Sequence, residues 1–194
     1  MLRVLTINLV VGLLLLTGCA LSPQVVSLNP ELDMNNFNAV GAGKRVALQV
    51  IDNRPGRVVG SRGGIYADTS LITTTADIAS PVRTEFAAAL NKLGFNVVTA
   101  GDTADADLRL LIDALEYKTA GGSVIRSIET AATLRTIGKV GKREFTGRYR
   151  ATKSKDVVKT PGPEENEVLI NAVISRVLER ALEDQALLEF LRDG

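Results

Sequence analysis

The 194-residue chain contains no histidine and no tryptophan, and it has a single cysteine. Without histidine there is no Ser-His-Asp triad, no Cys-His pair and no metal site with an imidazole ligand. One cysteine excludes an intrachain disulfide and all chemistry of paired cysteines. The charges nearly cancel, with 23 Lys and Arg against 22 Asp and Glu, which argues against nucleic acid as a partner. No cofactor is expected from the motifs that remain.

The first 18 residues have the composition of a signal peptide. Arg3 is their one charge, and the apolar run from Val4 to Leu16 is too short to cross a bilayer but suits the hydrophobic region of a signal. The motif Leu16-Thr17-Gly18-Cys19 follows and resembles a bacterial lipobox. The alternatives are a secretory signal with a chance cysteine, and a buried N-terminal helix.

The lipobox resemblance implies a lipid anchor. It implies that diacylglycerol alkylates the thiol of Cys19, that a signal peptidase cuts before this residue, and that the freed amine is acylated. Three acyl chains hold a protein on a membrane far more firmly than one. Ala20, in place of an aspartate, implies sorting to the outer membrane of a Gram-negative cell, with the domain facing the periplasm.

Residues 19–43 are expected to be the lipidated cysteine and a flexible tether, because prolines, glycines and asparagines recur there. The alternative is an edge strand that contains Val25, Val26 and Leu28 and stops at Pro30. Residues 44–194 are expected to form a single periplasmic domain.

Periodicity within this domain predicts strands at 44–51, 95–98, 107–117, 123–137 and 143–152, and a long loop at 57–78. One helix is predicted from an N-cap at Ser80 to Gly94, and another from about Glu164, with an interruption at Asp184-Gln185. The expected fold class is α+β, a mainly antiparallel sheet of about 4–6 strands with two helices packed on one face.

Several of these segments resemble the YajG-type family of bacterial lipoproteins. The lipobox contributes to the resemblance, together with Asp52-x-Arg54, Val59-Gly60, Phe86 to Val97, and the stretch from Asn171 to Leu191. The likeness covers about residues 44 to 192. It implies an outer-membrane lipoprotein of uncharacterised function with no catalytic residues to carry over.

Four further motifs have both a chemical and a structural interpretation. Gly60 to Gly64 suggests a phosphate-binding loop but lacks the Lys-Ser/Thr ending, so a surface loop is favoured. Asp102, Asp105 and Asp107 suggest a cation site, but without the spacing of an EF-hand they favour an acidic turn.

Asp52 and Arg54 favour a structural ion pair. Ser127 with Ser123 and Lys153 to Lys155 suggests a Ser/Lys nucleophile, although a solvated surface is favoured.

The charge distribution is uneven along the chain. Residues 139–159 hold eight Lys and Arg against two acids, whereas residues 164–193 hold eight acids against three Arg. Arg148, Arg150, Lys153 and Lys155 are therefore candidate contacts for an anionic surface. The competing interpretation is that the basic segment pairs with the acidic C-terminal helix.

These observations favour a non-catalytic binding or accessory role in assembly or maintenance of the cell envelope. The expected partners are the membrane, through the lipid on Cys19, and an envelope protein or an anionic glycan or lipid. The alternative function is an enzyme that acts on peptidoglycan fragments, or a glycan-binding module.

The first prediction concerns Cys19. The intact mass of the protein extracted from membranes should correspond to a chain that begins at Cys19 and carries diacylglycerol and an N-acyl group. Cys19→Ser should release the domain or leave it uncleaved, without unfolding it. An unmodified N-terminus on the mature protein would contradict the lipobox assignment.

Overall fold

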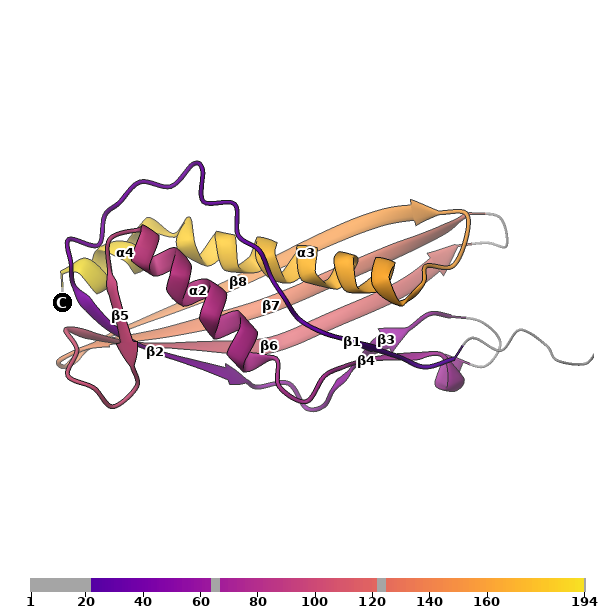
Figure 1. Ribbon diagram of the computed structural model, residues 1–194, viewed down its shortest axis with the longest axis horizontal. Coiled ribbons are helices and arrows are strands. Elements are labelled where there is room, and N and C mark those ends of the chain that lie inside the picture. Colours follow the sequence, from indigo (N-terminus) through magenta and orange to yellow (C-terminus); the bar gives the residue numbers. More distant parts are fainter. Residues whose placement is uncertain (1–21, 64–66, 122–124, 194) are drawn as a thin grey trace, which may run out of the picture.

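The computed structural model describes residues 22–63, 67–121 and 125–193. The predicted signal peptide and Cys19 lie outside this part of the chain. The described residues form an α+β fold in which α-helices lie on one face of an eight-stranded sheet (Figure 1). No helix among them is long and apolar enough to cross a bilayer.

The strands are β1 (Gln24–Val26), β2 (Arg45–Asp52), β3 (Val58–Ser61), β4 (Leu71–Thr74), β5 (Asn96–Thr99), β6 (Ala106–Gly121), β7 (Arg126–Val140) and β8 (Arg143–Val157). The α-helices are α2 (Ala79–Lys92), α3 (Pro163–Leu182) and α4 (Gln185–Arg192), and a 3₁₀ turn, η1, covers Ala67–Thr69.

The sheet is larger than expected and mixed, not mainly antiparallel. The long strand β6 lies at its centre, with β7 and then β8 antiparallel on one side. On the other side β2 runs parallel to the first half of β6, and β3 pairs with it near Tyr117. The helix α2 precedes β5 in the long connection from β2, which also contains β3 and β4, and this crossover returns β5 parallel to β2.

Alternation along the strands places the core on the helix side of the sheet. In β6, Leu108 and Leu110 are fully buried, whereas the alternating residues Asp107 and Arg109 are exposed. The predicted apolar stripes of α2 and α3 cover this buried side, and Phe86, Ile170 and Val177 are among its least exposed residues. The predicted break before α4 is also confirmed, since the Asp184 carboxylate accepts from the backbone N–H groups of Ala186 and Leu187.

The predicted loop at 57–78 is wrong, because it contains β3, η1 and β4. Strands of four residues are too short to show a clear alternation, and glycine and threonine conceal them. Gly60 is required where β3 crosses β6, since a Cβ there would collide with the backbone oxygen of Tyr117. Ser80 is not the N-cap: it lies inside α2, and Asp77 accepts a hydrogen bond from its backbone N–H instead.

The predicted tether is also corrected. Residues 22–43, called the strap from here on, lie against the domain, and Figure 1 shows them running from β1 across α3 to the end of the molecule that holds α4 and β5. The strap begins with β1, which pairs parallel with β4, so the alternative of an edge strand is the one the structure shows. Val26 and Leu28 are buried in the core, and Pro30 ends the run.

An aspartate should destabilise the protein on the docked face of α3 but not on its outer face. Val177 is 1% exposed and Val168 is 67% exposed on the same helix. Val177→Asp should lower the free energy of unfolding by about 3 kcal/mol or more, because it buries an unpaired carboxylate. Val168→Asp, the matched control, should change it by less than about 0.5 kcal/mol. Equal urea midpoints for the two variants would show that α3 is not docked.

Candidate functional site

One face of the sheet carries no helix in the described part of the chain. This open face consists of the outward side chains of β2, β6, β7 and β8, and it is polar and charged. Its cations are Arg45, Arg109, Lys118, Arg135, Lys139, Arg148 and Arg150, and its acids are Asp107, Asp113, Glu116, Glu129, Glu144 and Asp156. The two signs nearly balance.

The centre of the open face is organised around Asp113, which occupies a β-bulge of β6. Arg135 of β7 donates to both carboxylate oxygens, with Nε–Oδ2 and Nη2–Oδ1 distances of 3.0 Å. The side-chain amide of Asn53 donates to Oδ1 at 2.8 Å. These hydrogen bonds, above all that from Arg135, lower the pKa of Asp113 below its usual value, while burial opposes them and the charge of Arg148 adds to them.

Arg150 and Arg148 lie on neighbouring positions of this face. Arg150 donates to the hydroxyl of Thr133 at 3.2 Å and lies 3.8 Å from the carboxylate of Glu116. Lys118 donates to the same carboxylate at 2.7 Å and is the main cause of its lowered pKa. Arg148 stands opposite Arg135 in the β7–β8 ladder and forms no ion pair or side-chain hydrogen bond with the residues that the structure describes.

The structure divides the four predicted basic contacts between the two faces. Arg148 and Arg150 lie on the open face, exposed as the alternation in β8 predicts. Lys153 and Lys155 fall on the helix side, because β8 continues in the same alternation to Val157. There Lys155 donates to Glu165 of α3 at 2.7 Å. The interpretation that the basic segment pairs with the acidic C-terminal helix therefore holds for Lys155, which pairs with Glu165, but not for Arg148 on the opposite face.

A second polar surface follows the seam between the strap and α3. From Ser27 to Asp33, every second backbone N–H of the strap donates to a side chain of α3. The pairs are Ser27 with Glu167, Asn29 with Asn171, Glu31 with Ser175 and Asp33 with Glu179, at 2.9, 2.7, 3.0 and 3.3 Å. Two residues of extended chain advance about 6.6 Å and four helical residues about 6 Å, so the two repeats stay in register.

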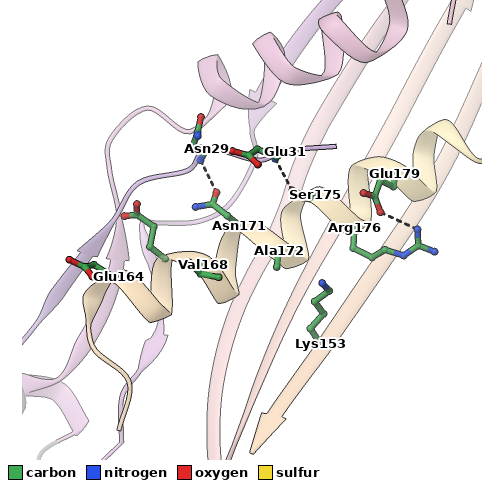
Figure 2. A pocket seen from close by; sticks show the side chains of 11 residues that line it. Asn29, Glu31, Lys153, Glu164, Val168, Asn171, Ala172, Ser175, Arg176 and Glu179 are labelled. Carbon is green, nitrogen blue, oxygen red and sulfur yellow. Dashed lines mark hydrogen bonds and ion pairs between the residues drawn. The ribbon is translucent and has the colours of Figure 1, made fainter. Parts of the chain in front are cut away.

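A groove of about 570 Å³ lies beside this seam, and Figure 2 shows Lys153 of β8 facing it from across α3. Most of its polar wall is already engaged: Asn171 and Ser175 hold the strap, and Arg176 pairs with Glu179 at 3.2 Å. The groove is therefore part of the seam, with mixed charges along its rim. Sequence reasoning missed this ladder, although the polar residues at 167, 171, 175 and 179 repeat at intervals of four.

A buried polar cluster lies beneath the start of α3. Arg62 is only 9% exposed, and its guanidinium donates to the carbonyl oxygens of Ser22 and Pro161, both at 3.2 Å. Nearby, the Tyr117 hydroxyl donates to the Asn166 side chain at 2.7 Å, and burial raises the pKa of Tyr117 to about 12. We call these residues the Arg62 cluster. Arg62 fastens Ser22, the first strap residue, to the loop before α3, and Tyr117 fastens β6 to α3.

The other candidate motifs have local structural roles. Gly60 and Ser61 belong to β3, so the described stretch begins as a strand and not as the surface loop expected from its composition; Gly64 lies outside the described residues. Asp52 accepts two hydrogen bonds from Arg54, at 2.8 and 2.9 Å, as the structural interpretation predicts. Arg54 lowers the pKa of Asp52 through these bonds.

The three aspartates near residue 105 do not converge. Asp102 and Asp105 accept from the backbone N–H groups of Thr99 and Arg45, whereas Asp107 faces outward from β6. Among the described residues, no group of three or more acids or cysteines is placed to hold a metal ion. Of the proposed Ser/Lys system, Ser123 lies outside the described residues, and Ser127 stands opposite Asp156 in the β7–β8 ladder.

Comparisons with known proteins place the chain among lipoproteins. A family model for "Uncharacterized lipoprotein" matches residues 30–192, in agreement with the YajG-type resemblance. No curated protein matches the chain.

Solved structures share the fold. Protein XCC0632 from Xanthomonas campestris is 11% identical, covering 89% of this chain and 98% of its own, with a TM-score of 0.54. A protein from Helicobacter pylori, described as a neuraminyllactose-binding hemagglutinin homologue, is 11% identical over 84% and 97%, with a TM-score of 0.50. The rare lipoprotein B from Shewanella oneidensis is 14% identical over 77% and 99%, with a TM-score of 0.48. At such identities the first two structures show a similar fold and nothing beyond it.

The pair of Asp113 and Arg135 should give stability a pH dependence. Because the folded-state pKa of Asp113 is lowered, the pair stabilises the fold above the unfolded-state pKa of about 4 and loses this effect as pH falls. Arg135→Gln should therefore lower the free energy of unfolding measurably at pH 7 and by much less at pH 3.

The matched control is Lys139→Gln, since Lys139 and Glu144 form a 3.6 Å pair between half-exposed groups on the same face. Urea unfolding of this variant should match wild type at both pH values. If Arg135→Gln lowered the free energy of unfolding equally at pH 7 and pH 3, the ionised Asp113 carboxylate would not be the stabilising partner of Arg135.

Proposed function

The chain belongs to a family of uncharacterized lipoproteins, and on this premise we propose a non-catalytic binding role in the Gram-negative cell envelope. The lipid on Cys19 holds the protein on the outer membrane, the domain faces the periplasm, and the open face binds an acidic region of an envelope protein. Arg148 and Arg150 are the proposed contacts of this face.

The observation that carries the proposal is the contrast between the two faces of one sheet. The helix side is closed by α2, α3, α4 and the strap, whereas the open face is broad, rigid and polar. On it Arg135 is neutralised by Asp113, and Arg150 is shared with Glu116. Arg148 is exposed beside them without such a pair, and it offers an acidic group the planar, bidentate contact that arginine makes with carboxylates.

The alternative of an enzyme acting on peptidoglycan fragments receives less support. Glycoside hydrolysis needs a general acid with a raised pKa. In the described part of the chain, the carboxyl groups with shifted pKa values are Asp52, Asp77, Asp113, Glu116 and Asp193, and in each the pKa is lowered. Such carboxylates are stabilised as anions.

Site-specific photo-crosslinking in intact cells tests the binding face. A photoreactive amino acid at Thr146 or Thr152, which are exposed on the open face, should yield an adduct of the same mass. The same probe at Lys92, exposed at the end of α2 on the helix side, should yield none. Arg148→Glu should abolish the adduct, because it replaces the free cation with an acid facing an acidic partner.

Lys142→Glu serves as the matched charge reversal, since Lys142 is exposed in the turn between β7 and β8. It should leave the adduct unchanged. An adduct that is equally strong from Lys92, or one that Lys142→Glu removes as well as Arg148→Glu does, would refute the open face as the contact surface.

A further inference from the structure

The position at which the chain leaves the folded body is fixed. The carbonyl oxygen of Ser22 accepts from the buried guanidinium of Arg62, which also holds Pro161. Three peptide units separate Ser22 from Cys19, and they span at most about 10 Å. A lipid on Cys19 therefore keeps this part of the surface close to the bilayer.

This exit lies at one end of the long axis of the molecule (Figure 1). Gly63, next to Arg62, shares a small pocket with Thr119, Gly121 and Arg126 at the tip of the β6–β7 hairpin. Arg126 in turn donates to the hydroxyl of Thr160, beside Pro161. We call this part of the surface the anchor end: Ser22, Gly63, residues 118–121, 125–127 and 157–161. The helix α4 lies at the opposite end of the long axis (Figure 1). The 15-residue strand β7, which runs between the two ends, is about 50 Å long.

Exposed apolar side chains gather in the half of the molecule that contains the anchor end. Val158 is 82% exposed and Ile125 is 59% exposed, and both belong to the anchor end itself. Val25 and Val58, 64% and 55% exposed, flank Thr73 on adjacent strands close to the exit, and Val168 lies near the start of α3. The described residues leave no other large hydrophobic side chain exposed.

We propose that the anchor end is a membrane-contacting surface, so that the domain stands upright on the bilayer that carries its own lipid anchor. Ile125 and Val158 enter the interfacial layer, and Lys118 and Lys159 lie at the level of the lipid phosphates. This inference rests on the lipidation of Cys19 in the proposed function. It adds a defined orientation, in which β6, β7 and β8 point away from the membrane.

The competing arrangement is a domain that lies flat with its open face on the lipid. The open face favours this less, because its charges are nearly balanced and several are paired with each other, so it lacks the cluster of free cations that binds anionic lipid. Arg148 on the open face lies nine residues from Val157 along β8, which is about 30 Å from the anchor end. Exposed valine and isoleucine beside a fixed lipid attachment favour the upright arrangement.

Depth measurements on the lipidated full-length protein distinguish the arrangements. Because Cys19 is blocked by lipid, an introduced cysteine is the one free thiol and can carry an environment-sensitive fluorophore. The labelled variants are Ile125→Cys and Val158→Cys at the anchor end, Thr146→Cys on the open face and Lys142→Cys at the far turn. Each is reconstituted in vesicles of phosphatidylethanolamine and phosphatidylglycerol that contain a spin-labelled quencher lipid.

Labels at 125 and 158 should be quenched at least threefold more strongly than those at 146 and 142. Strong quenching at 146 would overturn the upright arrangement in favour of the flat one. Weak quenching at all four positions, on protein that mass spectrometry shows to be lipidated, would overturn the membrane contact while leaving the anchor in place. A mature protein without lipid would defeat the proposed function, and this inference with it.

Discussion

The helix side of the sheet is closed by an extended segment that is hydrogen-bonded to two helices. Between Val26 and Asp33 the strap turns alternate side chains into the core, and α3 accepts the N–H groups of the residues between them. An extended chain outside a sheet has no ladder partner, and burying unpaired N–H groups is costly. The polar side chains on α3 meet that need, and α2 contributes Glu85, which accepts from Leu32. Without this match the strap would lie in water and the core beneath it would be open.

This arrangement leaves the two faces of the sheet with different roles. One face packs against the helices to form the core. Polar groups on that face are hydrogen-bonded, as Tyr149 is to Asp184 at the start of α4. The other face contributes little to the core and carries long side chains on three adjacent long strands. A rigid sheet keeps such side chains at fixed spacing, which suits recognition of a partner more than enclosure of a small substrate.

Long, strongly periodic elements were predictable from sequence, and contacts between distant segments were not. The stripe of α3, the cap at Asp184 and the alternation of β8 are all local patterns. The strap alternates from Gln24 to Pro30, but its partners on α3 lie 140 or more residues away, and its asparagines and prolines indicate a loop. The bulge at Asp113 is likewise hidden: it shifts the alternation of β6 so that Glu116 and Lys118, not Leu115 and Tyr117, share the open face with Asp107. The predicted strand ended at Thr152, whereas β8 continues to Val157. The same alternation, continued to that point, places Lys153 and Lys155 on the helix side.

The sequence separation within the Arg62 cluster has a consequence for the order of events during synthesis and export. Ser22, Arg62 and Pro161 meet only when the last third of the chain is present, and the ladder on α3 needs residues up to Glu179. The contacts of the strap with α3 can therefore form only after residues up to Glu179 have emerged, and a chain that ends before α3 lacks the acceptors for the N–H groups of Ser27 to Asp33. Such a chain is expected to leave these residues more open to proteases that recognise extended peptides.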